Sequence, residues 1–71
     1  MNKERRKRVI DAIRKIEDLV QDILSEEEEA FDNMPEGLQM SENGIISEEA
    51  QESLDAAIDA LEEAISYLEE I

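Results

Sequence analysis

The residues with the clearest capacity for chemistry are carboxylates, and four of them form one run, Glu26 to Glu29. A carboxylate can act as a general acid or base, ligate a cation, or attract a basic protein. The chain contains no histidine and no cysteine, and its last basic residue is Lys15. Acid–base catalysis needs a group whose pKa is shifted in a pocket, whereas these acids are expected to face solvent. The sequence therefore predicts no enzyme and no cofactor.

The segment 32–43 has a partial similarity to a calcium-binding loop. Asp32 stands at its first position and Gly37 at its sixth, as such a loop requires. Met34 occupies the third position, however, and Asn43 occupies the twelfth, where a bidentate Glu is needed. We therefore predict no metal site.

Charge is distributed very unevenly along the chain. All seven basic residues lie at or before Lys15, whereas 16–71 contains nineteen acids and no base, and the net charge is -14. The basic segment 3–8 could contact phosphates, but the field of the whole molecule would repel nucleic acid. We expect these bases to pair with acids of the same chain or of a second subunit, and we predict no direct binding of nucleic acid.

Two long helices must position these charges. Apolar residues recur at helical spacing from Val9 onward, without Gly or Pro until Pro35, so a first helix is predicted over about 3–33. A seven-residue pattern beginning at Leu54 and repeated at Leu61 and Leu68 predicts a second helix over about 47–71, with Ser47 as its N-cap.

The connection, about 34–46, is expected to contain turns at 35–37 and at Asn43-Gly44. Folding the chain back there pairs residues whose numbers sum to about 80, which sets apolar against apolar along both helices. The predicted fold is one all-α domain, an antiparallel two-helix hairpin. Its stripes are wide and a 71-residue core is small, so we expect dimerisation into a four-helix bundle. The residues predicted to form the core or the oligomer contact are Ile13, Ile16, Val20, Ile23, Leu54, Ile58, Leu61, Ile65 and Leu68.

The hairpin gathers acids at its loop end, where this chain offers no base to neutralise them. Carboxylates near a helix C-terminus oppose the helix dipole, so stability does not explain them. They form either a solubilising surface or a docking surface for a basic protein. Glu27 falls on the core stripe, where it either leaves the bundle or meets a base of the partner. The apolar loop residues either cap the bundle, the favoured alternative, or serve as exposed anchors. The candidate binding residues are Glu26, Glu27, Glu28, Glu29, Asp32, Glu36, Leu38, Met40, Glu42, Ile45 and Ile46.

No apolar run approaches the roughly 18 residues of a membrane span, and no signal-peptide core follows the charged start, because Asp11 interrupts Val9-Ile10. The sequence predicts no membrane contact and a cytoplasmic location in the host cell.

The segment EEEEAFDNMPEGLQMS (26–41), with the ending LEEAISYLEE (61–70), resembles small acidic helical-hairpin proteins of bacteriophages and conjugative elements of Gram-positive bacteria. The similarity extends over most of the chain from about Ile10. It implies an origin in a mobile element and supplies no catalytic residues. Small acidic proteins of such elements often block host nucleases and other defence enzymes by occupying basic surfaces.

These observations favour a protein that binds a basic host or phage protein through its acidic end and inhibits it, most simply a nucleic-acid-processing or defence enzyme. The alternative is a structural or assembly protein that acts through contacts between helices. Binding to DNA as a regulator is a third class, which the overall charge disfavours.

Overall fold

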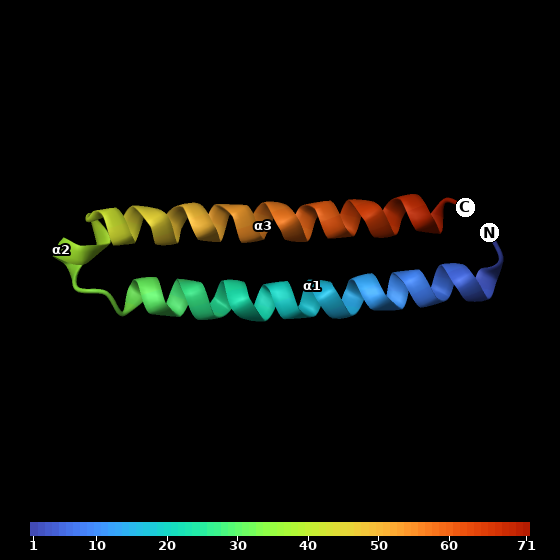
Figure 1. The fold of residues 1–71 in the computed structure, drawn as a ribbon, viewed down its shortest axis with the longest axis horizontal. Helices are drawn as coiled ribbons and strands as arrows, with labels where there is room; N and C mark the ends of the chain where they lie inside the picture. Colours follow the sequence, from blue (N-terminus) through green and yellow to red (C-terminus); the bar gives the residue numbers. More distant parts are fainter.

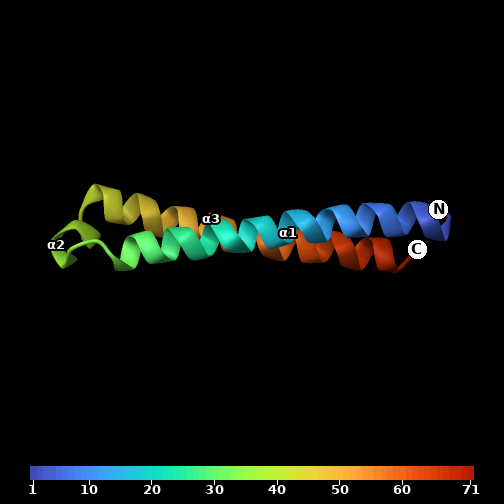
Figure 2. The same cartoon turned by 90° about the horizontal axis from the view of Figure 1, so that it is seen from below.

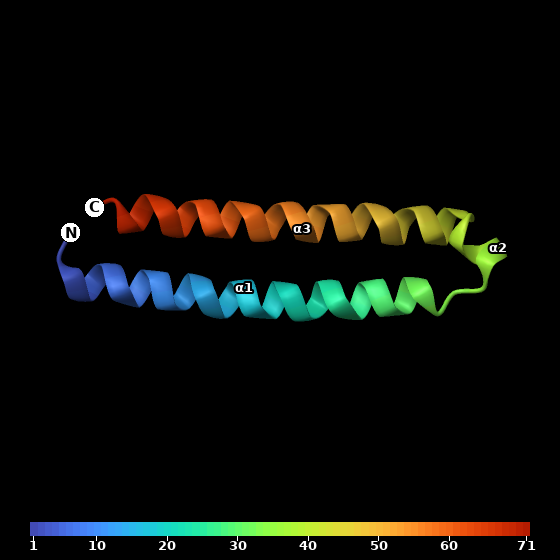
Figure 3. The same ribbon diagram turned by 180° about the vertical axis from the view of Figure 1, so that it is seen from behind.

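The chain forms a hairpin of two long helices in a computed structural model that describes all 71 residues. Helix α1 spans Lys3–Asp32, the short helix α2 spans Glu36–Gln39, and helix α3 spans Glu42–Glu69. Figure 1 shows α1 and α3 running side by side in opposite directions, with both termini at one end and α2 at the other. The same pairing is seen from behind in Figure 3. The prediction of an all-helical protein with a long antiparallel helix pair is therefore confirmed.

Helix α1 begins and ends as local chemistry predicts. The Asn2 side chain accepts a hydrogen bond from the backbone N–H of Arg5 at 2.8 Å, which caps the first turn. The helix ends at Asp32, close before Pro35, because proline disfavours helical geometry in the residue before it.

Helix α3 starts five residues earlier than the sequence indicated. Asn43-Gly44, expected as a turn, lies in its first turn, and Ser41 occupies the N-cap position that was assigned to Ser47. Ser47 is instead a buried residue inside the helix. The predicted loop at 34–46 is therefore wrong in extent, since α2 and the start of α3 fill most of it.

Close packing at the connection explains this difference. Gly44 lies so near the backbone of Gln39 that an added Cβ would overlap the Gln39 carbonyl group and lie 2.7 Å from its Cα. The Gln39 side chain in turn donates hydrogen bonds from Nε2 to the carbonyl oxygens of Phe31, at 3.0 Å, and Met34, at 3.2 Å. The Phe31 carbonyl oxygen also accepts from the Met34 backbone N–H at 3.0 Å, so Gln39 adds a second donor there and supplies one to the Met34 carbonyl just beyond the helix. The connection is thus tied to both long helices.

The contact between α1 and α3 follows a heptad pattern. The more buried residues of each long helix alternate three and four positions apart, as in an antiparallel coiled coil. Figure 2 shows the two helices crossing at a shallow angle, as such packing requires. We call these residues the seam. In α1 they are Ile10, Ile13, Glu17, Val20, Leu24, Glu27, Phe31 and Met34, and the last of these lies just beyond the helix. In α3 they are Gly44, Ser47, Gln51, Leu54, Ile58, Leu61, Ile65 and Leu68.

The seam is a thin core. Ile58 and Ile65 are the only buried large apolar residues, at 7% exposure each, whereas eleven large apolar residues are exposed. The radius of gyration is 16.2 Å, and the molecule measures 54 × 15 × 11 Å. A compact chain of this length would have a radius of gyration of about 11 Å. Two of the residues predicted for the core or oligomer contact, Ile16 and Ile23, are among the exposed ones in the single chain.

Candidate functional site

The loop end of the hairpin concentrates negative charge. Residues 19–58, the half of the hairpin that contains the connection, hold twelve acids and no base. The other half, residues 1–18 and 59–71, holds all seven bases and nine acids. The two ends therefore carry net charges of -12 and -2, and the candidate carboxylates all belong to the more negative one. A basic surface would be attracted to the loop end over several ångströms.

Of the four carboxylates in the run, Glu27 differs from the others. Its Oε1 accepts a hydrogen bond of 2.7 Å from the Ser47 hydroxyl, and it is part-buried in the seam. It therefore lies in the seam rather than where the stripe leaves the bundle, which was one of the two expectations for it. Glu26, Glu28 and Glu29 are exposed. Glu27 thus contributes to the helix pairing, and the exposed three remain candidates for binding.

The other candidate acids surround the connection. Asp32 stands in the last turn of α1, Glu36 opens α2 and Glu42 opens α3, and all three are exposed. Glu36 and Glu42 occupy first turns, where the helix dipole favours a carboxylate, so their positions need no functional explanation. Asp32 has no such local reason.

The apolar residues of the connection do not cap the bundle, which was the favoured expectation. Leu38 and Ile45 are about half exposed, at 51% and 52%, and Met40 is 81% exposed. Ile46 is exposed to a similar degree. These side chains lie beside the acids, where they are accessible to a partner.

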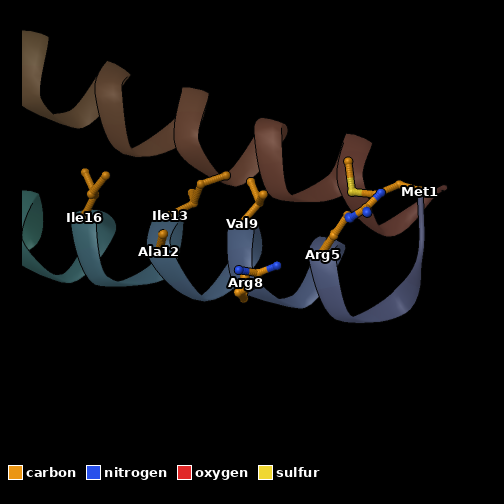
Figure 4. A pocket seen from close by; sticks show the side chains of 7 residues that line it. All are labelled: Met1, Arg5, Arg8, Val9, Ala12, Ile13 and Ile16. Atoms are coloured by element: carbon orange, nitrogen blue, oxygen red, sulfur yellow. The ribbon is translucent and has the colours of Figure 1, made fainter.

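The basic end makes few ion pairs. Arg14 reaches Glu69 across the helix pair at 3.8 Å, and Lys7 contacts Asp11 within α1 at 2.7 Å. The Lys7 hydrogen bond holds the pKa of Asp11 below its usual value. Arg5 and Arg8 form no ion pair in the single chain. They line an open groove at the start of α1, which Figure 4 shows together with Val9, Ile13 and Ile16.

Two carboxyls meet at the edge of the seam, near its middle. One oxygen of Glu17, Oε2, is buried without a hydrogen-bond partner, and the Glu62 carboxyl faces Glu17 from α3. Loss of contact with solvent raises the pKa of Glu17, and the neighbouring Glu62 raises this pKa further. Two carboxyls can share a hydrogen bond only when one of them is protonated. Sequence reasoning missed this pair, although Glu17 interrupts the apolar 3-4 pattern between Ile13 and Val20.

The two sides of the hairpin that flank the seam differ strongly in polarity. The Arg14–Glu69 pair marks one side, and every flanking residue on it is polar: Lys7, Arg14, Gln21 and Glu28 from α1, and Glu48, Asp55, Glu62 and Glu69 from α3. The seam has a second edge, and helix geometry places the residues along that edge on the other side of the hairpin. These are Val9, Ile16, Ile23 and Ala30 from α1, and Asn43, Ala50, Ala57, Ala64 and Ile71 from α3, and all of them except Asn43 are apolar.

We call this apolar side, together with the next column outward, the side face. The outer column adds the apolar residues Ala12, Leu19, Ile46, Ala60 and Tyr67, and it also contains the polar residues Arg5, Glu26 and Ser53. Leu19 is 57% exposed and Ile16 is 50% exposed. An amphipathic helix needs one apolar stripe to pair with one neighbour, and each long helix here has two. The stripe width noted in the sequence therefore corresponds to a second, uncovered surface.

The fold and these surfaces define an antiparallel helical hairpin of the coiled-coil type, with an acidic end and an apolar side. No family model, no curated protein and no solved structure matches the chain. None of its helices combines the length and the apolar character needed to cross a membrane. The side chains form no group of three or more potential metal ligands.

Proposed function

We propose that this chain is a non-enzymatic protein-binding module, whose acidic loop end docks on a basic surface of another protein and inhibits it. The observation that carries the proposal is the set of twelve acids in residues 19–58, with no base among them. The connection is held by Gln39 and Gly44, so the acids are presented on a fixed framework. A preorganised charged surface speeds association and selects partners of opposite charge.

The exposed apolar side chains beside the acids support the same function. Charge alone gives fast but unselective encounters, whereas buried apolar anchors supply most of the binding energy at an interface. Leu38, Met40, Ile45 and Ile46 are available for this role because they are exposed around α2. Methionine suits it well because its side chain adapts to the surface that it meets.

The partner proposed is a host or phage protein that normally holds nucleic acid in a basic groove, such as a nuclease or another defence enzyme. The anionic loop half of this 54 Å long hairpin could occupy such a groove in place of the phosphate backbone. The resemblance to proteins of phages and conjugative elements agrees with this choice of partner and with action in the host cytoplasm.

We further propose that the hairpin works as a dimer, a four-helix bundle. The exposed side face supports this, since a core with two buried isoleucines is thin for independent stability. The same face also favours a second candidate function, a structural or assembly protein whose specific contacts are made by helices rather than by acids.

A capture experiment from a Gram-positive bacterial lysate, read by mass spectrometry, separates these functions. The test variant carries Glu28→Gln, Asp32→Asn and Glu36→Gln, and it should lose nucleic-acid-binding proteins that the natural chain retains. The matched control carries Glu4→Gln, Asp18→Asn and Asp59→Asn, which remove the same charge away from the loop end. The control should retain these proteins. Equal capture by both variants would contradict docking through the loop end.

Loss of capture in Leu19→Glu, with full capture by the loop-end variant, would instead favour the assembly function. Leu19 lies on the side face and outside the seam, so this substitution leaves the pairing of α1 with α3 intact.

A further inference from the structure

The side face is a large apolar surface that no other part of the single chain covers. Eight of its nine residues next to the seam are apolar, all but Asn43 at the start of α3, although the eight equivalent residues on the opposite side are all polar. Random exposure of apolar residues would not separate the two sides so clearly. Solvent exposure of such a continuous stripe is unfavourable, so it indicates a surface that another molecule covers.

Charged residues along the edge of this face show what covers it. On the surface of α1, the next column beyond the side face repeats every seven residues and consists of Arg8, Lys15, Asp22 and Glu29. Two bases are followed by two acids. A column with this order is complementary to itself when a second copy of α1 runs in the opposite direction, since each base then meets an acid.

We propose that a second copy of this chain covers the side face, with the loop ends of the two copies at opposite ends of the bundle. Helix α1 then packs on α1 of the second copy and α3 on α3. Arg8 pairs with Glu29 of the second copy, and Lys15 pairs with Asp22 of the second copy. The proposal specifies the interface and orientation of the dimer proposed above, and it does not depend on docking to a basic protein.

The central apolar residues of α1 fit this arrangement in one register, whereas Val9 and Ala30 at its ends meet Glu26 and Arg5 of the second copy. With the charge pairs in place, Ile16 lies against Leu19 of the second copy, and Ala12 lies against Ile23 of the second copy. The twofold axis then passes α1 between residues 17 and 18. The same axis passes α3 at residue 62, where Ala60 lies against Ala64 of the second copy. Glu17 and Glu62 face each other across the helix pair, so these two points lie at the same level and one axis serves both helix pairs.

The small side chains of α3 allow that pair of helices to approach closely. Ala50, Ala57, Ala60 and Ala64 present almost no bulk, whereas α1 contributes Val9, Ile16, Leu19 and Ile23. Interaxial distance follows the size of the contact residues, so the α1 pair would be wider than the α3 pair. The result is a four-helix bundle of unequal sides.

The opposite orientation, with both loop ends together, fails on charge. It would also give Arg8 and Lys15 acidic neighbours, Glu70 and Glu63 of the second copy. However, it would stack two loop halves of net charge -12, with no base in either. The proposed orientation places each of these halves beside a half of net charge -2 that contains all seven bases. Repulsion between nearby like charges therefore selects the arrangement with loop ends apart.

The mass in solution tests the interface. Analytical ultracentrifugation should give twice the chain mass of 8.1 kDa for the natural protein. Leu19→Glu should return it to 8.1 kDa, because a charge would be buried at the centre of the interface. Gln21→Glu, on the polar side of the seam, is the matched control and should remain a dimer. A natural chain of 8.1 kDa at every concentration overturns the proposal.

A distance measurement tests the orientation. The chain has no cysteine, so Glu36→Cys places one spin label on α2 of each copy. Pulsed electron resonance should find the two labels separated by nearly the 54 Å length of the molecule. Labels much closer than half of that length would place the loop ends together and overturn the proposed orientation. Neither measurement involves another protein, so their outcome is independent of whether the loop end binds a basic partner.

Discussion

The hydroxyl of Ser47 donates a hydrogen bond to Glu27 Oε1 at 2.7 Å, from the second turn of α3 to the last third of α1. Ser47 is 3% exposed, so this contact joins a buried donor to a carboxylate where the seam contains few apolar groups. It fixes the register of the helix pair near the connection. It also accounts for one of the four acids at the end of α1.

Replacing Ser47 with Ala should therefore destabilise the hairpin by about 1 to 2 kcal/mol, the usual loss for a hydrogen bond to a charged group. Urea unfolding followed by circular dichroism, at fixed protein concentration, measures this difference. Ser66→Ala is the control, because Ser66 is exposed in the same helix. It should gain up to about 0.5 kcal/mol from helix propensity. A gain of the same size in Ser47→Ala would show that the bond to Glu27 contributes nothing.

Replacing each of the two glycines with alanine should change the stability of the hairpin in opposite directions. Gly44→Ala forces the new Cβ into the backbone of Gln39, so α2 and the start of α3 must separate. We expect a loss on the order of 2 kcal/mol, as for other overpacked sites. Gly37→Ala meets nothing within 4 Å, and it should instead stabilise the hairpin by up to about 1 kcal/mol.

Nuclear magnetic resonance supplies a local reading of the Gly44 effect. The Gln39 side-chain amide donates to Phe31 and Met34, so its protons should exchange slowly in the natural chain. Exchange should become fast in Gly44→Ala and stay slow in Gly37→Ala. Slow exchange in both would show that the connection tolerates a methyl group at position 44.

The seam predicts a clear contrast between two isoleucines of α3. Ile65 is buried, so Ile65→Ala should cost about 2 to 4 kcal/mol, and much of the helicity should be lost. Ile45 is 52% exposed and lies outside both the seam and the side face, so Ile45→Ala should change stability by less than about 1 kcal/mol. Thermal unfolding of the two variants by circular dichroism makes the comparison. Equal losses would mean that the helices pack in a different register.

The long helices and their antiparallel pairing could be predicted because a helical period of roughly 3.6 residues shows directly in the spacing of apolar residues. Leu54, Leu61 and Leu68 mark the stripe of α3 without any tertiary information. The division of that stripe into a seam and a side face could not be predicted. Ile13 and Ile16 are equally apolar, and only the position of the second helix decides which of them is covered.

The connection was predicted less well because tertiary contacts override its local signals. Asn43-Gly44 is a strong turn signal, but glycine is needed there for the close approach of Gln39. Ser47 followed by two acids is a typical helix start, yet its hydroxyl donates a hydrogen bond to Glu27 instead of capping the helix. The Glu17–Glu62 pair was within reach of the sequence. Pairing residues whose numbers sum to about 80 places these two acids together.

This carboxyl pair predicts how stability depends on pH. The pKa of Glu17 is raised in the folded chain, so the folded state binds a proton at pH values where the unfolded state has released it. The contribution of Glu17 to stability is therefore full below its ordinary pKa of about 4.5 and is lost as pH rises through the raised value. Asp11 acts in the opposite sense, since its pKa is lowered and its contribution is lost as pH falls.

Glu17→Gln should consequently raise the melting temperature at neutral pH, because an amide can donate to Glu62 without carrying charge. The gain over the natural chain should shrink as pH falls through the raised pKa, where Glu17 acquires its own proton. Glu62→Gln should act in the same way, and the double variant should show less than the sum of the two effects, since both remove one repulsion. Glu52→Gln removes the same charge from an exposed position that does not act on Glu17, and it serves as the control. A pH-independent gain equal in Glu17→Gln and Glu52→Gln would indicate a general charge effect rather than a carboxyl pair at the edge of the seam.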